Sequence, residues 1–467
     1  MQSKRGGLTM KNQYRFLARI IIEAKSPLNI GSGNKGIKSD SLVLRDINGL
    51  PFIPGTTIAG LLRHTLGKDE DQYMGSQQMG SPLIITEAKM LDCDGTVLDG
   101  ILSQEKQNSP FLANYRQLPI RQHAKIGHRG ATIKGGKFDE EIVLKGTRFC
   151  FEIEMLSDKE NDAKFKELLN TLNSDTFRIG SGSRSGFGEI CVVDCQCLYK
   201  KVNLDNEGQK AWYLKKSSSL SEDWLDAETI SLEAPNTAGW TTYTLQLKPV
   251  DFLLFGSGFG NDKADMTFVR ETFVDWSTNP AQIKDREHVV LIPASSVKGA
   301  LSHRLAFHHN KLRNRFADTL ASGETIEDFV GKNNEAVKAV FGSEGEKDAD
   351  GKMQNKLRGN VLMSDIIQEA VISPKILNHV SIDRFTGGAI DGALYSEETH
   401  YAKGQTYELK LMVNNTAFVD KDVKTAFENT LKDLCSGMLP LGGGVNRGNG
   451  CFEGTIKRNG ELIYGNN

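Results

Sequence analysis

The sequence predicts an α+β protein made of two tandem copies of one unit. Residues 31–66 and residues 256–305 carry the same succession of glycine-rich loop, short extended segment and helix start. The matched positions are Asp40 with Asp265, Arg45 with Arg270, and Asp46 with Glu271. Since self-similarity over such a length marks a repeated structural unit, the 467 residues divide into two domains that each bury a core.

The glycine-rich loops are candidate contacts for a polymer. Glycine allows positive φ and the close approach of another backbone, which a loop lying against a phosphate needs. The first loop also satisfies the dinucleotide fingerprint GxGxxG, but that fingerprint requires a helix to open at the glycines. Here the loop runs into a short β-branched stretch, so a nucleotide cofactor is not expected. The candidate loop residues are Gly31, Ser32, Gly33, Lys35, Gly256, Ser257 and Gly258.

A helix is predicted to start after each extended segment. Residues 54–57 and 293–296 place threonine and serine hydroxyls before apolar positions, which is the pattern of a side-chain N-cap. Residues 41–45 are too short and too β-branched for a helix, so they are predicted to form a strand.

The rest of each unit follows one order. The pairs are the strands at 83–86 and 360–363, the glycine-rich hairpins at 123–141 and 379–398, the strands at 149–155 and 407–413, the helical faces at 165–172 and 423–434, and the glycine turns at 179–188 and 441–450. With a first strand at residues 14–20, this is a ferredoxin-like α+β pattern, the fold of RNA-recognition domains. A glycine-rich hairpin recurs at the same place in each unit, so we expect it to be an inserted element that projects and binds a partner. The simpler alternative is a solvated hairpin without a binding role.

The domain boundaries follow from composition. Residues 1–12 are polar and basic and are predicted to be a flexible arm, and residues 13–197 form the first unit. Residues 198–240 are polar and acidic and are predicted to be a connector, with residues 241–467 as the second unit. The second unit carries an inserted segment at 308–340, which is predicted to be helical around residues 335–340.

Charge and cysteine content exclude several classes. The net charge is -2, with 57 basic and 59 acidic residues, so any nucleic-acid surface must be a local basic strip. Cys191, Cys195 and Cys197 share one strand face by parity, and reduced thiols are favoured over a zinc site. Because no signal peptide and no apolar run of about 18 residues is present, a cytoplasmic protein without a membrane partner is expected.

Basic residues lie among the glycines of both turns. The alternative is a tight β-turn, but arginines among many free backbone amides suit phosphate contacts. The candidates in the turns are Arg184, Asn446 and Arg447, and those in the first hairpin are Lys125, His128 and Arg129.

Three motifs carry a resemblance to a known family. The turn GGGVNRGNG, the block HVSIDRFTGGAIDGALYSEE and the segment IPASSVKGAL together resemble the RAMP superfamily. More closely, they resemble the backbone subunits of type III CRISPR effector complexes, and two such units in one chain are similar to the double backbone subunit of type III-D complexes. This resemblance implies a palm that binds the guide RNA, a thumb hairpin that displaces a nucleotide, and a loop aspartate that cleaves paired target RNA.

The family motif places the cleaving residue at Asp40 and Asp265. Its Ser-Ser-x-Lys-Gly motif is intact in the second copy, whereas the first copy has Ala59 in place of the lysine and Arg63 a turn later. Its Ile-Asp-Arg motif is intact at residues 382–384 and altered at 126–128. The RNA-binding residues implied in this way are Arg45, Arg63, Arg270, Ser295, Ser296, Lys298 and Arg384.

The implied chemistry is metal-assisted cleavage of RNA. A displaced phosphodiester can present its 2′-hydroxyl in line for attack, while a carboxylate helps to hold a divalent metal, Mg²⁺, that stabilises the developing charge. The expected partners are guide RNA, complementary target RNA, and other RAMP-type and large subunits of a type III complex. Alternatives are a scaffold in which Asp40 and Asp265 are Asx-turn residues, and a metal-independent processing ribonuclease that uses His64 or His303.

Overall fold

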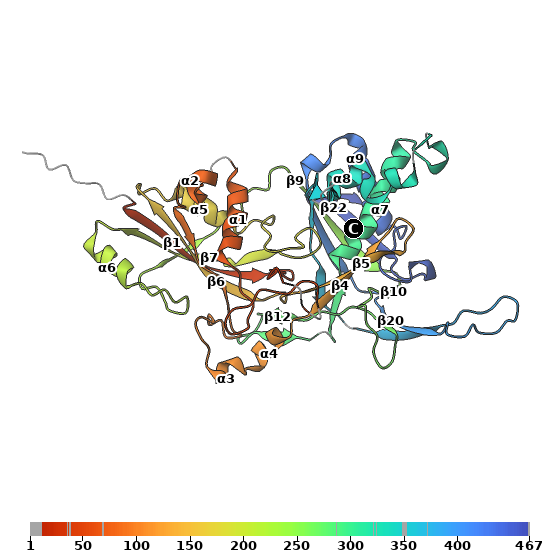
Figure 1. The fold of residues 1–467 in the computed structure, drawn as a ribbon, viewed down its shortest axis with the longest axis horizontal. Coiled ribbons are helices and arrows are strands. Elements are labelled where there is room, and N and C mark those ends of the chain that lie inside the picture. Colours follow the sequence, from red (N-terminus) through yellow and green to blue (C-terminus); the bar gives the residue numbers. More distant parts are fainter. Residues whose placement is uncertain are drawn as a thin grey trace, which may run out of the picture.

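The computed structural model describes residues 12–34, 36, 39–67, 70–285, 287–320, 322–323, 325–347, 353–370 and 372–465. Within these residues the chain forms two main antiparallel sheets, each with helices packed on one face, and several smaller sheets (Figure 1). The prediction of an α+β protein is confirmed. The predicted arm, except for Asn12, and Lys35 lie outside the described residues. In the described part of the chain, no helix has both the length and the apolar character needed to cross a bilayer.

The first sheet is organised around its first strand. β1 (Tyr14–Ala24) lies between β6 (Arg148–Ser157) and β7 (Ile190–Asn203), antiparallel to both. Side chains of β1 such as Phe16 and Ile20 are fully buried against α1 and α5. The remaining elements of this layer are β2 (Leu83–Ile85), β3 (Lys89–Met90), β8 (Glu228–Ser231), α1 (Gly55–Leu66) and α5 (Ala163–Thr171).

The second sheet repeats this plan. β9 (Trp240–Pro249) lies between β21 (Tyr407–Asn414) and β22 (Phe452–Arg458), and the full order is β17-β21-β9-β22-β23. Tyr243 and Leu247 of β9 are fully buried in the core that the helices complete. These outer strands and helices are β17 (Val361–Met363), β23 (Glu461–Tyr464), α7 (Ala294–Leu312), α8 (Glu335–Phe341) and α9 (Lys421–Cys435). α8 agrees with the helix predicted in the inserted segment.

Each unit carries a hairpin outside its main sheet. The first is β4 (Ile120–Ile126) with β5 (Thr132–Glu141), and it lies across α7 of the other unit (Figure 1). The second is β19 (Pro374–His379) with β20 (Tyr395–Tyr401), and its tip projects away from the body of the molecule (Figure 1). β10 (Phe252–Leu253) and β11 (Met266–Thr267) pair with β20.

Short elements complete the described chain. These are α2 (Glu70–Met74), α3 (Gln104–Gln107), α4 (Pro110–Arg116), β12 (Phe273–Asp275), β13 (Gln282–Lys284), β14 (Val289–Ile292), β15 (Glu346–Lys347), β16 (Met353–Gln354), β18 (Ile366–Glu369) and the 3₁₀ turns η2 (Ala317–Thr319), η3 (Ile326–Asp328), η4 (Gly331–Asn333), η5 (Asn415–Ala417) and η6 (Val445–Arg447).

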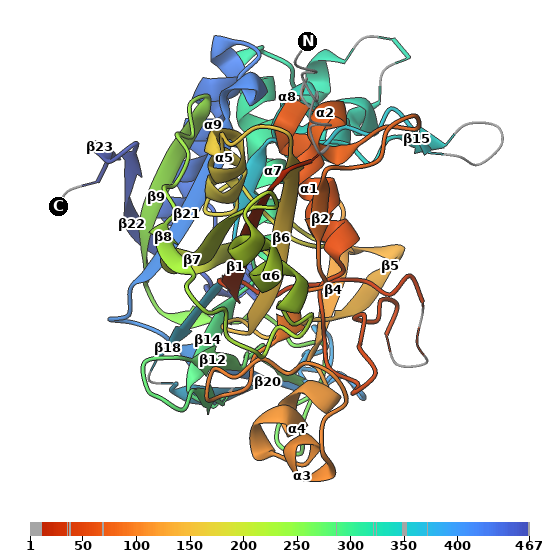
Figure 2. The same ribbon diagram turned by 90° about the vertical axis from the view of Figure 1, so that its left-hand side faces the viewer.

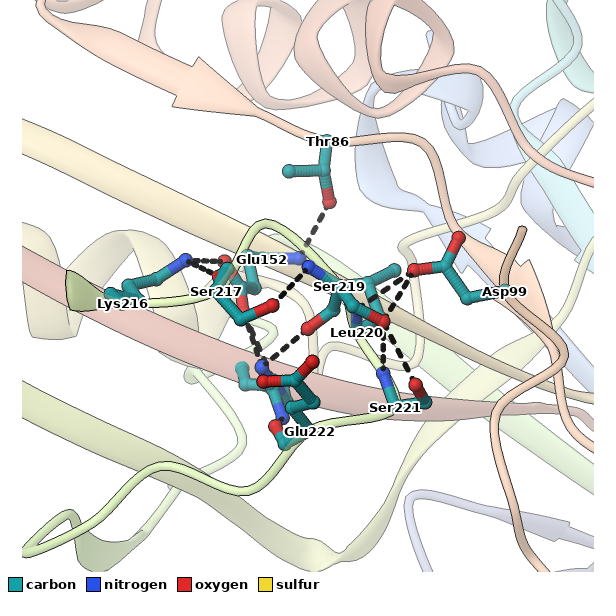
Figure 3. A network of polar contacts seen from close by, with 10 residues as sticks. Thr86, Asp99, Glu152, Lys216, Ser217, Ser219, Leu220, Ser221 and Glu222 are labelled. Carbon is teal, nitrogen blue, oxygen red and sulfur yellow. Dashed lines mark hydrogen bonds and ion pairs between the residues drawn. The ribbon is translucent and has the colours of Figure 1, made fainter.

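The segment predicted as a connector packs on the first sheet. It supplies the end of β7, the helix α6 (Glu207–Lys215) and β8, and it covers the sheet face opposite α1 and α5 (Figure 2). Lys216 donates to Glu152 of β6 at 2.7 Å, and the Leu220 amide donates to Asp99 at 2.9 Å (Figure 3). Trp224 is buried there beside Arg19.

The predictions of side-chain helix caps and of a shared cysteine face are wrong. The helices begin at Gly55 and Ala294 after proline N-caps, and no side chain of the predicted hydroxyls caps them. Instead the Ala294 amide donates to Asp365 at 2.7 Å, so the cap comes from a distant residue. Cysteine parity fails because positive φ at Asp194 and Cys195 forms an irregularity in β7, which leaves Cys195 exposed and Cys197 buried.

A buried ion cluster joins the two units. Arg121 of the first hairpin contacts Asp365 at 2.8 Å and Glu271 at 2.5 Å, and all three side chains are buried. Gly186 of the first glycine turn has no room for a side chain, because an added Cβ would lie 2.3 Å from Asp365 Oδ1. The first unit therefore meets the second through a close backbone approach and a paired charge cluster.

Candidate cleavage and RNA-binding site

Asp40 lies at the base of the first hairpin. Its amide donates to Asp139 Oδ1 of β5 at 2.8 Å, and the Asp139 amide donates to Asp40 Oδ2 at 3.4 Å. The next residue, Ser41, forms a parallel bridge with Glu140. Two carboxylates from separate segments therefore meet on an exposed edge, and Asp40 itself is exposed.

Asp265 occupies the equivalent place in the second unit. Its amide donates to Ser396 Oγ at 3.0 Å, and Asp265 Oδ2 accepts from the Ser396 amide at 2.7 Å and from Ser396 Oγ at 2.9 Å. These hydrogen bonds lower the pKa of Asp265, first through the backbone and then through the side chain of Ser396. Met266 then pairs in parallel with Glu397, as Ser41 pairs with Glu140.

A histidine and an aromatic ring flank each aspartate. His123 stacks on Phe138 with ring centroids 4.8 Å apart, and His379 stacks on Tyr395 at 5.0 Å. His123 Nε2 lies 3.0 Å from Glu140, and His379 Nε2 lies 3.1 Å from Glu397. Neither pair is aligned for a regular hydrogen bond, so these are close electrostatic contacts.

Arg45 and Arg270 hold the base of each hairpin. Arg270 Nη2 lies 2.5 Å from Glu398 Oε1, and Arg45 Nη2 lies 3.6 Å from Glu141 Oε1. Arg45 also donates to the Tyr115 carbonyl at 2.6 Å. Both arginines thus position the strand that carries the partner of the aspartate, and neither guanidinium projects freely into solvent.

The two glycine loops have matching geometry. Gly31 bridges Val43 and Gly256 bridges Phe268, so each loop folds back on the extended segment that follows. Gly33 and Gly258 both have positive φ, at 77° and 85°, which side chains rarely adopt. Ser32 and Ser257 hydroxyls accept from the amides two residues on, so both serines support the loops.

The arginines of the glycine turns diverge. Arg184 Nε donates to the Gly359 carbonyl of the other unit at 2.8 Å. Arg447 instead makes two 2.8 Å contacts with Glu397 of its own hairpin and also reaches the Tyr395 hydroxyl. The neighbouring Asn446 is exposed. The turns therefore place their arginines at two different sites.

The helix starts bring further predicted residues to the contact between units. Ser296 is exposed and Ser295 half-buried at the start of α7, and Lys298 is half-buried one turn in. Arg63 of α1 pairs with Asp71 at 2.7 Å. His303 Nε2 lies 3.4 Å from the Ile126 carbonyl of the first hairpin.

The predicted RNA-binding residues of the two hairpins lie apart from one another. Lys125 pairs with Glu344 at 2.6 Å, while His128 and Arg129 approach Glu327 at 3.7 and 3.8 Å. The first hairpin therefore contacts the inserted segment of the second unit. Arg384 is exposed in the loop of the second hairpin, where Asp383 accepts from the Phe385 amide at 2.7 Å.

The donor sets limit what metal each site can hold. Among the described residues, no group of three or more histidine, cysteine, aspartate or glutamate side chains is arranged for a metal ion. Asp40 with Asp139 offers two carboxylates, and Asp265 with Ser396 offers one. Mg²⁺ commonly takes one or two carboxylates and completes its shell with water and substrate phosphate, so this sparse donor set fits it.

Sequence reasoning missed the partners of the aspartates. Asp139 and Ser396, the His-Glu pairs and the stacked rings all come from the two hairpin blocks. Their signal was the alignment of Phe-Asp-Glu-Glu at 138–141 with Tyr-Ser-Glu-Glu at 395–398, together with a histidine opening each block.

The chain matches the family described as the RAMP superfamily over residues 21–191 and 241–453. The chain belongs to the RAMP superfamily. The two matched regions confirm the tandem arrangement of RAMP units. The chain is also 30% identical over 227 residues to the "CRISPR system Cms endoribonuclease Csm3" of Methanocaldococcus jannaschii. That alignment covers 44% of this chain and 88% of that relative. One Csm3 therefore corresponds to less than half of this chain, and the chain is a homologue of Csm3.

Proposed function

We propose that this chain is a guide-RNA-binding backbone subunit of a type III CRISPR complex and that it cleaves complementary target RNA near Asp40 and Asp265. The observation that carries the proposal is the duplicated geometry: each aspartate exchanges hydrogen bonds with the base of its unit's hairpin. Two such sites in one chain supply two equivalent places of cleavage along one RNA.

The strand order supports an RNA-binding palm in each unit. Both sheets place the first strand between the third and fourth, with the second strand beside the third, as in ferredoxin-like RNA-recognition folds. We assign the hairpins β4–β5 and β19–β20 as thumbs. The glycine loops and the cations around them would contact the sugar-phosphate backbone of the RNA. Such contacts hold RNA with little dependence on its base sequence.

The chain's own residues would position the target for cleavage. Ser396 and Asp139 fix the aspartate loops against the hairpins, and the stacked rings of Phe138 and Tyr395 lie one residue before them. A bound Mg²⁺ would be held by Asp40 with Asp139 and by Asp265, and would supply charge stabilisation for a phosphodiester attacked by the neighbouring 2′-hydroxyl.

A non-catalytic scaffold is the second candidate. Asp265 Oδ2 accepts both donors of Ser396, which is also what a purely structural clamp of the hairpin base would do. In either role, the chain's partners are guide RNA, target RNA, other RAMP-type subunits and large subunits of the complex. The complex would act in the cytoplasm.

The test uses the complex purified with its guide RNA from the native operon. Labelled complementary RNA should be cut at two places one repeat apart with Mg²⁺, and chelator should stop both cuts. Asp40→Asn and Asp265→Asn should each slow one cut by at least about 100-fold, the effect typical of losing a group that stabilises developing charge. Target binding should be unchanged in both variants.

The control is Asp205→Asn, which changes an exposed aspartate on the far side of the first sheet. It should leave both cuts intact. Full cleavage at both places by the double variant would remove the catalytic assignment and leave the scaffold.

A further inference from the structure

The second unit carries a small hairpin that the first unit lacks. Asp46 matches the residue 225 positions later and Pro54 the residue 239 positions later, so the second unit has fourteen extra residues in this stretch. They include β12 and β13, which pair antiparallel, and we call residues 273–284 the clamp. In the first unit this stretch is a tight turn, in which the Gly49 amide donates to the Asp46 carbonyl at 3.0 Å. The first unit therefore has no clamp of its own among its described residues.

The clamp packs into the core of the first unit. Val274 and Ala281 are buried among side chains of the first sheet and its helices, and Trp276 packs against the same core. The Ala281 amide donates to the Cys93 carbonyl of the first unit at 2.7 Å. Since buried apolar side chains are the main source of stability, the second unit supplies part of what holds the first unit together.

The clamp docks on a Lys-Gly turn that precedes β6. The Val274 amide donates to the Lys145 carbonyl at 2.8 Å, and Lys145 forms a parallel bridge with Phe273. Trp276 Nε1 donates to the Gly146 carbonyl at 2.7 Å. Gly146 has a φ of 83°, and an added Cβ there would lie 2.0 Å from the Val274 carbonyl oxygen. The turn therefore offers the clamp two carbonyl acceptors and a backbone that no side chain covers.

The second unit repeats this turn immediately before β21. Lys403 and Gly404 match Lys145 and Gly146, and Gly404 has a φ of 88°. A Cβ added to Gly404 would meet no atom within 4 Å. In the part of the chain that the structure describes, no backbone amide donates to the carbonyl of Lys403 or Gly404. The second unit therefore has the turn of the docking site without a clamp upon it.

Exposed apolar side chains lie beside the uncovered turn. Tyr401 is 42% exposed, and its ring meets the edge of the Phe252 ring with centroids 5.3 Å apart. Val250 is 41% exposed, and the next residue, Asp251, accepts from the Ala402 amide at 3.3 Å. Apolar side chains in water next to open backbone acceptors favour association with another chain. We use the term docking face for Val250, Tyr401, Lys403 and Gly404.

We infer that the docking face binds an extended segment of a different protein subunit, in the way that the clamp binds the first unit. The clamp sets the chemistry of this segment: a backbone amide for the Lys403 carbonyl, a side-chain N–H for the Gly404 carbonyl, and an apolar residue beside Tyr401. A second copy of this chain does not fit, because its own clamp is buried in its first unit. The inference deepens the proposed function by assigning a surface to a partner subunit, and it rests on that function.

The first test is photochemical cross-linking in the complex purified with its guide RNA from the native operon. The photoreactive residue p-benzoylphenylalanine replaces Lys403, whose side chain is exposed and whose carbonyl is kept. Irradiation should join this chain to one other protein subunit, and mass spectrometry of the joined peptides should place the bond in an extended segment of that subunit. A bond to RNA, a bond to a second copy of this chain, or no bond at all would overturn the inference.

The second test closes the docking face with Gly404→Asn. Asparagine tolerates positive φ, and the space around Gly404 admits its side chain in the free chain. The side chain would take the place of the docked segment, so the subunit found by cross-linking should bind at least about tenfold more weakly. Native mass spectrometry across a dilution series measures this affinity. The matched control is Gly460→Asn, since Gly460 has a φ of 87° and equally open space, and it should leave the affinity unchanged.

The outcomes separate this inference from the proposed function. If the complex keeps its guide RNA and both cuts while Gly404→Asn and Gly460→Asn bind the subunit equally well, the docking face is wrong and the proposed function stands. If Gly404→Asn lowers the melting temperature of the free chain, the cross-link from position 403 decides alone. If the chain purifies with neither guide RNA nor another subunit, the proposed function and the docking face fall together.

Discussion

The two aspartate sites share a backbone frame and differ in the residue that partners the aspartate. In the first unit the hairpin presents a second carboxylate, Asp139, to Asp40. In the second unit the same position is Ser396, which donates two hydrogen bonds to Asp265. The first arrangement places two carboxylate residues side by side, whereas the second gives its aspartate both hydrogen-bond donors of one serine. The repeat has therefore kept the geometry of the site while changing its electrostatics.

The hairpins differ more than the aspartates. Arg121 of the first hairpin is buried between two carboxylates of the second unit. Leu377 has the same register position in the second hairpin, since Arg121 pairs with Glu140 and Leu377 with Glu397. Leu377 is half-buried. One hairpin is thus a fixed part of the contact between units, and the other leaves its equivalent position open.

The largest expected effect tests this difference between the hairpins. Arg121→Met leaves Glu271 and Asp365 buried without their partner, so we expect the free energy of unfolding to fall by about 3–5 kcal/mol. Leu377→Ala is the matched control and should cost about 1 kcal/mol or less. Urea unfolding followed by circular dichroism measures both. Equal losses in the two variants would show that the hairpins are anchored alike.

A residue exchange sharpens the comparison of the aspartate sites. Asp139→Ser should raise the Mg²⁺ concentration needed for half-maximal cleavage at the first site about tenfold, because one carboxylate is lost. Ser396→Asp should lower it at the second site by a similar factor. Cleavage of labelled target RNA, titrated with Mg²⁺ in each variant, gives both values. Unchanged Mg²⁺ dependence at both sites would show that these partners do not help to hold the metal.

The smallest expected effect concerns the titration of Asp265. Its folded-state pKa is depressed, so the stabilisation from Ser396 is complete above the ordinary pKa of an aspartate and is lost as pH falls through the lower folded value. Ser396→Ala removes the hydroxyl and keeps the amide, so the pKa should rise part of the way back. Carboxyl carbon NMR against pH measures this rise.

Ser277→Ala provides the control for that titration. Asp275 also has a lowered pKa because it accepts from the amide and hydroxyl of Ser277. This variant should move the titration of Asp275 and leave Asp265 where it is. If Ser396→Ala leaves the Asp265 titration unchanged, the hydroxyl makes no such contact in solution.

Several features could be read from the sequence because the repeat carries them. The matched loops, the helix starts and the two hairpin blocks place Asp40 and Asp265 at equivalent positions, as the structure has them. Residues 41–45 form only isolated bridges where a strand was expected, since they pair with three different segments. The strand order itself depends on pairing between distant segments, which local patterns do not specify.

Other features could not be read, and each has a physical reason. Asp365 caps α7 from the connection between β17 and β18, far along the sequence, so no local cap signal existed. The irregularity at Asp194 and Cys195 breaks side-chain alternation without glycine or proline to mark it. The arginines of the glycine turns looked alike in sequence, but they stand one position apart within the repeat, and their partners lie on different elements.

The projecting second hairpin also governs how the free chain behaves in solution. Phe385 is 99% exposed, Leu394 71% and Ile382 61%, all near the hairpin's end. Apolar side chains in water give nothing to folding, and next to the unpaired edge of a strand they favour self-association. This loop should therefore lower the colloidal stability of the isolated protein, and its solubility at high concentration should rise when another surface covers these three side chains.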